Sequence, residues 1–432
     1  MQQLFEKALG LVPPWKVTRS ESDPKAQRLD LFLDFERGAR FRCPACGAEG
    51  CPVHDTEDEE WRHLNFMQYP LYLHARVPRV RCEKDGVRQI DLPWARPGSG
   101  FSHLFEAFVM TLAAEMPVKA IADLLGEHDT RIWRVVHFHV ERARAREDFS
   151  KVRHVGVDET SRRRGQRYAS LLCDLERARL LFATPGKDGG AFGRFKDDLV
   201  AHRGEPAQLV ELCMDMSPAY VSGATEHFAG VPITFDRYHL MQDLNFALDQ
   251  VRRSEQASRA LPARHLWSRR RRTQLPTLKK SRYLWLRNPA KLSDRQRAEV
   301  ERLSAVHDRT GRSYRIELAF QELYTQCPEE AEAYPRRWYA WAIRSRLIPI
   351  VEFARTVKQL WDGVLRCFTS KVSDGILEAI GSLVQAAKRR ARGYRTTENL
   401  IVIASLVAGK LDLATHTSWR GAPISQDPTG RL

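Results

Sequence analysis

The sequence predicts a mixed α/β protein: a small cysteine-containing domain, a helical domain, and a sheet domain that a long helical stretch interrupts. Three observations predict this order. Clustered Cys and His and short alternating segments fill residues 1–95, apolar runs alternate with helical stretches over 153–240, and helical periodicity dominates most of 240–410. A hydrophobic fraction of 43% among 432 residues is enough for a packed core, which excludes a largely disordered chain.

The charge balance indicates a polyanion as partner. The chain carries 69 Lys and Arg against 54 Asp and Glu, a formal net charge of +15, and such a surplus favours phosphate-rich surfaces. A basic enzyme with another substrate is the alternative. Eight cysteines among 432 residues do not form a disulfide framework, and we find no membrane-spanning run or N-terminal signal. We therefore expect a cytoplasmic protein with reduced thiols.

The cysteines near the N-terminus predict a zinc site. Cys43-Pro-Ala-Cys46 has the C-x-x-C spacing that aims two thiolates at one tetrahedral ion. A second pair is expected downstream, where Cys82 is followed by Asp85 in place of another Cys or His. Two nearby residues could replace the fourth ligand, Cys51 and His54. We expect Zn²⁺ on Cys43, Cys46, Cys82 and Asp85; the alternative is a decayed site with ordinary buried cysteines.

The segment that follows predicts three short helices. Apolar residues repeat at helical spacing over 104–112 and 118–125, and Gly126 ends the second helix. Asp129 can cap a third helix, whose inward face is Ile132, Val136 and Val140. This arrangement suits a helix-turn-helix domain that points Arg131 and Arg134 toward a DNA major groove. A plain three-helix bundle with a solvated arginine face is the alternative.

The next segment predicts a sheet with acids at its strand ends. The elements are, in order, strands at 154–159, 168–174 and 178–183, a helix at 192–200, and strands at 208–214 and 231–235. Three antiparallel strands followed by helix, strand, helix and strand are the order of an RNase H-like fold. The first and fourth strands are parallel neighbours in that topology, so we expect Asp158 and Asp215 to lie side by side.

A third acid is predicted on a late helix. Residues 373–392 have helical periodicity, and Glu378 shares a face with Arg389 and Arg392, while Arg390 lies beside them. Such a face suits a DNA phosphate backbone. Carboxylate oxygens are ligands for Mg²⁺ or Mn²⁺, and two such ions about 4 Å apart promote phosphodiester displacement. We therefore expect Asp158, Asp215 and Glu378 to hold magnesium or manganese.

The other acids near these strand ends have open roles. Asp236 ends the fifth strand and could replace Asp215 as a metal ligand, although its strand is expected one position further out. His239 could position a phosphate or cap a helix. Glu159 could support a metal ligand or simply be an exposed acid.

These motifs resemble insertion-sequence transposases of the ISL3 family, within the DDE superfamily. The resemblance runs over nearly the whole chain. It is most specific in four blocks: Val157-Asp158-Glu159, Asp215-Met-Ser-Pro-Ala-Tyr220, Phe235-Asp236-Arg-Tyr-His239-Leu240, and 373–378 continuing into 388–395. The chain departs from the family pattern twice, with Asp374-Gly375 in place of Asn-Gly and with Asp85 in place of Cys or His.

The resemblance implies an enzyme that cuts and joins DNA. Asp158, Asp215 and Glu378 would be its metal-binding triad; water would cleave the strand at the end of the element, and the freed 3′-hydroxyl would attack target DNA. Its partners would be double-stranded DNA, as terminal inverted repeats and as target, and further copies of the chain on paired ends. The alternatives are a non-catalytic DNA-binding regulator derived from a transposase and another metal-dependent nuclease on the same fold.

We expect six segments: a zinc-finger-type domain (1–95), a helix-turn-helix domain (96–150), the first part of the catalytic domain (151–245), a helical insertion (246–370), the C-terminal catalytic helices (371–413) and a loose tail (414–432). The insertion mixes cations with aromatic residues over 264–272 and 279–287. We expect those cations to face DNA and Trp285 and Leu286 to be core residues.

Overall fold

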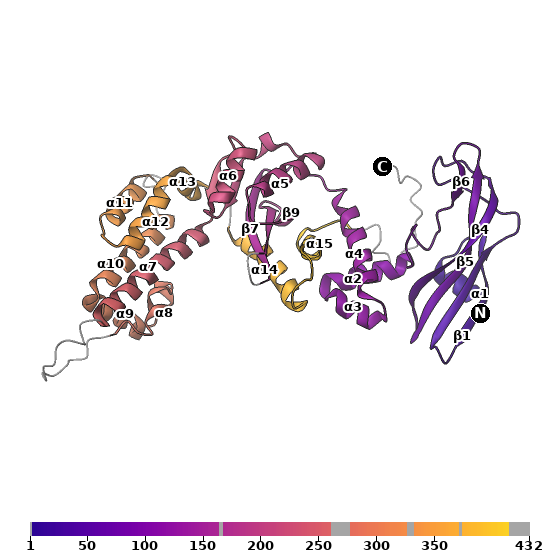
Figure 1. The fold of residues 1–432 in the computed structure, drawn as a ribbon, viewed down its shortest axis with the longest axis horizontal. Helices are drawn as coiled ribbons and strands as arrows, with labels where there is room; N and C mark the ends of the chain where they lie inside the picture. The colour runs from indigo at the N-terminus through magenta and orange to yellow at the C-terminus, as the bar shows by residue number, and fades with distance from the viewer. Residues whose placement is uncertain (1, 164–166, 261–276, 326–331, 371–373, 414–432) are drawn as a thin grey trace. The chain divides into compact units, whose positions relative to one another are not determined.

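The computed structural model describes residues 2–163, 167–260, 277–325, 332–370 and 374–413. The chain divides into two compact units, one built mainly from residues 1–146 and the other mainly from residues 147–410 (Figure 1). The predicted tail and the arginine run at 264–272 lie outside the described residues. Within the described ranges, no helix is both long and apolar enough to cross a membrane.

The N-terminal unit begins with a six-stranded sheet in the order β1-β2-β5-β4-β3, with β6 also paired to β5. Its strands are β1 (Trp15–Asp23), β2 (Arg28–Phe35), β3 (Arg40–Phe41), β4 (Cys51–Phe66), β5 (Tyr69–Cys82) and β6 (Gly86–Gln89). Apolar and polar residues alternate along β2 and β5, so one face of the sheet is buried around Leu31, Leu73 and Trp61. A short helix, α1 (Gln2–Leu9), precedes the sheet and was not expected from the sequence.

Three helices complete this unit, as predicted: α2 (His103–Glu115), α3 (Val118–Leu125) and α4 (Asp129–Arg144). Ser102 caps α2, and Gly126 ends α3 in the left-handed conformation with φ +67°. The predicted cap of α4 was wrong by one residue, because His128 accepts the hydrogen bond from the Thr130 N–H and Asp129 is the first helical residue.

Residues 93–100 are packed between the sheet and the helices. Trp94 is buried against Trp15 and Trp61 of the sheet. On the helical side, the fully buried Glu106 of α2 accepts from Arg96 at 3.0 Å and from Ser99 at 2.6 Å, and pairs with His139 of α4 at 2.7 Å. The segment is therefore part of the core of this unit.

The second unit contains a five-stranded sheet in the order β11-β10-β7-β8-β9. Its strands are β7 (His154–Arg163), β8 (Arg167–Asp174), β9 (Arg179–Pro185), β10 (Glu211–Met214) and β11 (Ile233–Phe235). β7, β8 and β9 are antiparallel, whereas β10 is parallel to both β7 and β11. This is the predicted RNase H-like order.

Helices cover this sheet. In Figure 1, α5 (Gly190–Ala201) and α6 (Pro218–His227) lie along one side of it, and α14 (Asp374–Arg390) and α15 (Thr397–Ala408) lie along the other. Between β11 and α14 the chain forms the predicted helical insertion, comprising α7 (Arg237–Ala260), α8 (Arg282–Trp285), α9 (Asp294–Val306), α10 (Asp308–Glu322), α11 (Ala333–Ile343), α12 (Ile348–Gln359) and α13 (Trp361–Thr369).

The insertion is joined to the sheet domain by a continuous apolar core. Leu240 and Leu244 of α7 belong to the same cluster as Val157 of β7 and Phe320 of α10. The predicted core position of Trp285 is confirmed, since it is 1% exposed in a second cluster with Tyr314. The insertion therefore holds a fixed position on the sheet through α7.

Candidate active site and metal centre

Three acids lie side by side on three adjacent strands, β7, β10 and β11. β10 pairs with β7 so that Cys213 faces Gly156, and two residues further along the chain are Asp215 and Asp158. β10 pairs with β11 so that Met214 faces Phe235, which brings Asp236 next to Asp215. Asp215 and Asp236 directly follow their strands, whereas Asp158 lies within β7, which continues to Arg163 and not only to the predicted residue 159. The parallel register still places the three carboxylates along one edge of the sheet.

The late helix passes directly over this edge. A Cβ at Gly156 would lie 2.6 Å from Leu377 of α14, and a Cβ at Gly381 would lie 3.2 Å from Oδ2 of Asp158. Further along, Gln385 Nε2 donates to Oγ1 of Thr160 at 2.7 Å. Every fourth residue of the helix therefore lies beside every second residue of β7. This match is possible because four residues of a helix and two residues of a strand both span about 6 Å. The helix runs beside the strand with glycines at its two closest approaches.

Glu378 lies one turn before Gly381 on this helix and is exposed. Positions three apart on a helix share a face, so Glu378 belongs to the side of α14 that approaches Asp158. The three predicted metal ligands therefore come from adjacent elements. Among the described residues, however, they are not one of the groups whose ligand atoms all lie within 4.8 Å of one another.

The carboxylates at this edge repel one another. Burial raises the pKa of Asp158, and the nearby carboxylates of Asp236 and Glu159 raise it further. Lys187 partly balances this charge: its Nζ lies 2.6 Å from Glu159 and 3.2 Å from Asp215. Each of these carboxylates disfavours the ionised form of its neighbours. A divalent cation bound to their oxygens would relieve that repulsion, so the site fits such an ion.

Asp236 lies at the edge of the sheet and forms hydrogen bonds with the first turn of α7. Its Oδ1 accepts from the Tyr238 N–H at 2.6 Å, and its Oδ2 lies 2.9 Å from Nδ1 of His239. Asp236 thus caps α7 and also fixes the orientation of the imidazole. Asp215 is also bound at both oxygens, by the Ser217 N–H at 3.0 Å and by Lys187 Nζ at 3.2 Å, so these bonds do not distinguish the two acids as metal ligands.

Two residues near the acids had no signal in the sequence. Lys187 is a lone lysine in the turn after β9, and Asp243 is one acid among several on α7. Burial raises the pKa of Asp243; His239 lowers it and Asp215 raises it, so Asp243 is close to both. Only the folding of the turn and of α7 toward the sheet edge brings them there.

The predicted zinc ligands converge in the N-terminal unit. Cys43, Cys46, Cys82 and Asp85 form a group in which all ligand atoms lie within 4.8 Å of one another. Cys46 Sγ lies 3.5 Å from Cys82 Sγ, and Oδ2 of Asp85 lies 3.5 Å from Cys43 Sγ. The backbone N–H groups of Asp85 and Lys84 lower the pKa of Cys82. Three cysteine sulfurs and one carboxylate gathered this closely fit zinc.

Neither substitute ligand belongs to this group of four. His54 Nδ1 lies 3.0 Å from Nη2 of Arg81, and the Cys51 thiol donates to the Ala48 carbonyl at 3.5 Å. Asp85 therefore supplies the fourth side chain of the cluster.

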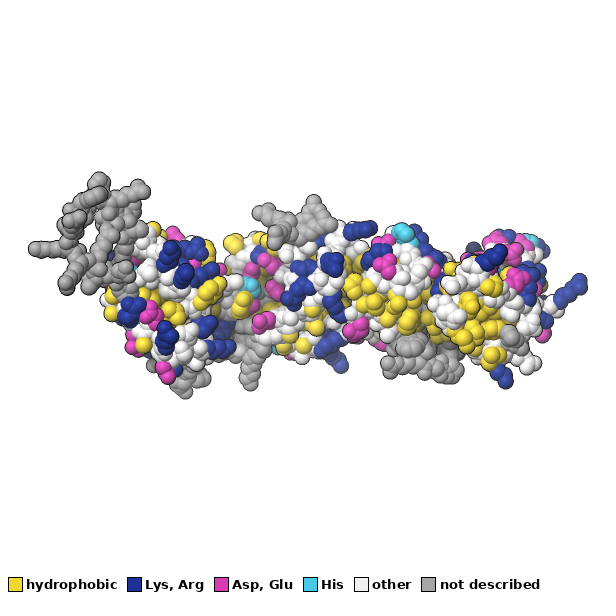
Figure 2. Space-filling model, turned by 90° about the horizontal axis from the view of Figure 1, so that it is seen from below, with side chains coloured by type: hydrophobic (Ala, Val, Ile, Leu, Met, Phe, Trp, Pro, Cys, Tyr) yellow, Lys and Arg dark blue, Asp and Glu magenta, His cyan; other side chains and the backbone are white. Residues whose placement is uncertain are grey.

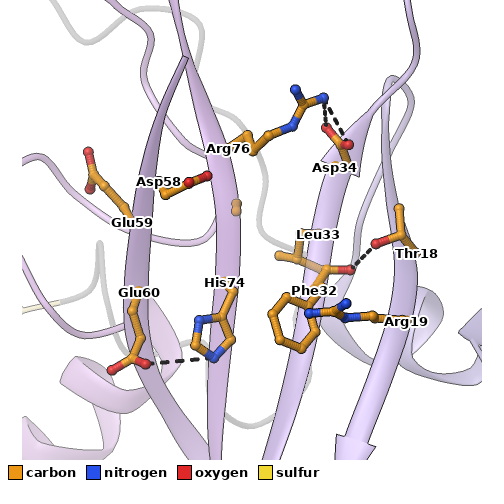
Figure 3. Close-up of a pocket in the computed structure, with 11 residues that line it drawn as sticks. Thr18, Arg19, Phe32, Leu33, Asp34, Asp58, Glu59, Glu60, His74 and Arg76 are labelled. Carbon is orange, nitrogen blue, oxygen red and sulfur yellow. Dashed lines mark hydrogen bonds and ion pairs between the residues drawn. The ribbon is translucent and has the colours of Figure 1, made fainter.

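A second group of possible ligands lies on the outer face of the same sheet, beside a cavity of 690 Å³ (Figure 3). It consists of Asp30, Glu60 and His74. Arg28 already neutralises it, with Nη2 at 2.6 Å from both carboxylates, and Phe32 stacks on His74 at 4.7 Å. This group is an ion-pair network on a sheet surface.

The predicted DNA-contacting arginines fall into two sets. Arg131 is partly buried: it pairs with Glu127 at 2.5 Å and lies 4.3 Å from the centre of the Phe101 ring. Arg390 donates to the Glu115 carbonyl of α2. Arg390 is nevertheless exposed, as are the other three, namely Arg134, Arg389 and Arg392. Figure 2 shows Lys and Arg over each part of the visible face, with Asp and Glu among them.

Comparison with known proteins finds one family in three parts of the chain. A family model described as "Transposase", of the ISL3 type, matches residues 155–404. A model described as "Helix-turn-helix domain of transposase family ISL3" matches residues 90–140. A third, the "zinc-finger of transposase IS204/IS1001/IS1096/IS1165", matches residues 39–85 and so covers the cysteine cluster.

Curated relatives match along most of their length. The chain is 27% identical over 385 residues to the transposase for insertion sequence element IS1557 of Mycobacterium tuberculosis, covering 84% of this chain and 85% of that protein. It is 26% identical over 364 residues to the transposase for insertion sequence element IS1001 of Bordetella parapertussis, covering 82% and 86%. Since the transposase model alone spans more than half of the sequence, the chain belongs to the ISL3 family of transposases and is a DNA transposase with a DNA-binding helix-turn-helix domain and a zinc ribbon.

Proposed function

We propose that this transposase binds the ends of its own insertion sequence and there cleaves and joins DNA with divalent metal ions, Mg²⁺ or Mn²⁺, held by Asp158, Asp215 and Glu378. The observation that carries the proposal is the position of α14. The helix passes over Asp158 with only a glycine at the closest approach, and Glu378 lies one turn away on the same side.

The protein side of this reaction consists of holding and orienting groups. Asp158 and Asp215 are fixed by the register of β7 and β10, so their carboxylates keep a constant spacing while DNA binds. Metal ions there would activate the attacking oxygen and neutralise the leaving one. Glu378 is exposed on the helix above and would complete the ligand set when DNA lies along α14.

The DNA-binding part of the proposal rests on exposed arginines. Arg134 projects from α4 and pairs with no described residue, so it is available for a base edge or a phosphate in the major groove. Arg389 lies in the last turn of α14, whereas Arg392 lies beyond the end of the helix and not on the predicted helix face. Both are exposed and would contact a DNA phosphate backbone. The packing of Arg131 on Phe101 favours a role in holding α4 in place.

We further propose that the chain works in the cytoplasm, where its cysteine cluster stays reduced and holds zinc, and that two or more copies act together on paired ends. We also propose the domain limits 1–95 and 96–150. Most of both segments, residues 1–146, lies in the N-terminal unit.

The proposal is tested by cleavage of DNA carrying the inverted repeats that flank the gene, with Mg²⁺, for wild type, Glu378→Gln and Glu352→Gln. Glu352 is an exposed glutamate on α12 and serves as the matched control. We expect wild type and Glu352→Gln to cut and Glu378→Gln to bind without cutting. Binding without cutting by all three would refute the enzyme and would indicate the non-catalytic regulator.

A further inference from the structure

His239 lies at the edge of the sheet beside the catalytic acids. The Asp236 N–H donates to the Met214 carbonyl at 2.9 Å, which ties the start of α7 to β10 immediately before Asp215. His239 follows in the first turn of α7, and its Nδ1 lies 2.9 Å from Oδ2 of Asp236. The backbone therefore fixes the imidazole close to Asp215 and Asp158.

The imidazole is oriented with one nitrogen open. Asp236 accepts from Nδ1, so that nitrogen carries a proton. Nε2 contacts no described residue, and 33% of the side chain is exposed. The hydrogen bond to Asp236 raises the pKa of His239, and the carboxylates of Asp215 and Asp158 raise it too. In its protonated form the ring presents Nε2–H toward solvent at the edge that holds the acids.

The charges around the acids show what this donor is suited to bind. The acids are Asp158, Asp215, Asp236 and Glu159, and Lys187 and His239 are two described basic side chains beside them. Lys187 is held between Glu159 and Asp215. His239 is hydrogen-bonded at one nitrogen only, and a free ring N–H next to metal-binding carboxylates suits a phosphate oxygen.

We propose that His239 donates from Nε2 to a non-bridging oxygen of the DNA phosphodiester to be cut and so positions that phosphate between Asp158 and Asp215. The inference rests on the proposed function, because it needs the scissile phosphate to reach this edge. Asp236 is then a positioning residue that acts through His239, in addition to capping α7.

Two substitutions separate this role from a purely structural one. Asn at position 239 can keep the bond to Asp236, because its amide reaches the place of Nδ1, but it has no donor at the place of Nε2. Gln places its amide near Nε2 instead. A matched control is His154→Asn, since His154 also pairs with a carboxylate, Glu176, at 2.7 Å, but at the opposite end of β7.

The experiment measures cleavage of the flanking-repeat DNA and, in a Glu378→Gln background that leaves DNA intact, its affinity. We expect His239→Asn to lose cleavage on the order of 10- to 100-fold, the size of one charged hydrogen bond, and His239→Gln to retain most of it. A neutral methylphosphonate at the scissile position should abolish the affinity difference between the background protein and its His239→Asn form.

The opposite results are equally clear. Normal cleavage by His239→Asn together with a loss in His239→Gln would assign the imidazole to holding Asp236 and would overturn the proposal. Equal losses in the two variants would overturn it as well, because Gln would then not replace the donor at Nε2. A wild type that binds but does not cut would refute the proposed reaction instead, and the affinity comparison with the methylphosphonate would still decide the role of His239.

Discussion

The two ligand clusters of this protein are built in different ways. The four side chains of the cysteine cluster come from two short turns that one sheet brings together, and their ligand atoms already lie within 4.8 Å of one another. The proposed catalytic acids come from two neighbouring strand segments and a distant helix, and Lys187 contacts Asp215. A site that holds a structural ion can close on it, whereas a site that works on DNA has to stay open to its substrate.

The largest effect is expected at the closed cluster. Cys82→Ser should abolish the one zinc ion per chain that we expect in wild type and should unfold the segment around residues 39–85, because structural zinc supplies on the order of 10 kcal/mol to small domains. Elemental analysis and limited proteolysis check this. A protease-resistant N-terminal unit without zinc would contradict it and would support a decayed site.

At the open site, Asp158→Asn should remove cleavage and leave folding and DNA binding intact. We expect a loss on the order of 10³-fold or more in cutting, since a metal ligand acts directly on the transition state, with affinity for end DNA nearly unchanged. Cleavage and gel-shift assays on the same DNA check this. A variant that still cuts would place the metal on other acids.

The same substitution has an expected effect on stability. The pKa of Asp158 is raised in the folded protein, so its contribution to stability is present at acidic pH and is lost as pH rises through the folded value. At neutral pH and without metal, Asp158→Asn should therefore raise the free energy of unfolding, and adding Mn²⁺ to wild type should do the same. Calorimetry with and without the ion distinguishes a metal site from a plain acid.

A buried acid for which we propose no metal provides a reference for the acids of the proposed metal site. Glu317 on α10 is 2% exposed, accepts from Gln321, and has one oxygen that contacts no described residue. Burial raises its pKa to about 7. Its stabilising contribution is present below about pH 4.5 and is lost as pH rises through about 7, which amounts to roughly 3 kcal/mol. Glu317→Gln should flatten the pH dependence of urea unfolding by that amount; an unchanged profile would refute the assignment.

The smallest effect concerns the lysine at the open site. Lys187→Met should raise the affinity for Mn²⁺ about two- to fivefold, because it removes a partly exposed ion pair that competes for Asp215. Titration with Mn²⁺ measures the change, and Lys196→Met, an exposed lysine on α5, is the control. Weaker binding in Lys187→Met would show that the lysine supports the ion.

The sequence predicts the sheet of the second unit well, because strand period, turn positions and helix order are local signals. It also predicts that Asp158 and Asp215 share an edge, which follows from parallel neighbours. Lys187 and Asp243 could not be found, since only the tertiary path of a turn and a helix brings them to the acids. The pairing of Arg131 with Glu127 has the four-residue spacing of a helical ion pair and could have been expected.

The buried bonds of Glu106 to Arg96, Ser99 and His139 have a consequence for the DNA that this protein reads. Together with the packing of Trp94 on Trp15 and Trp61, they connect the sheet that carries the cysteine cluster to α4, and we expect both to meet a double helix at a constant separation and angle. One added base pair rotates one binding site about 34° around the duplex axis and shifts it about 3.4 Å relative to the other. The DNA ends of such an insertion sequence can therefore accumulate base substitutions. Insertions or deletions between the two contacted positions would be selected against.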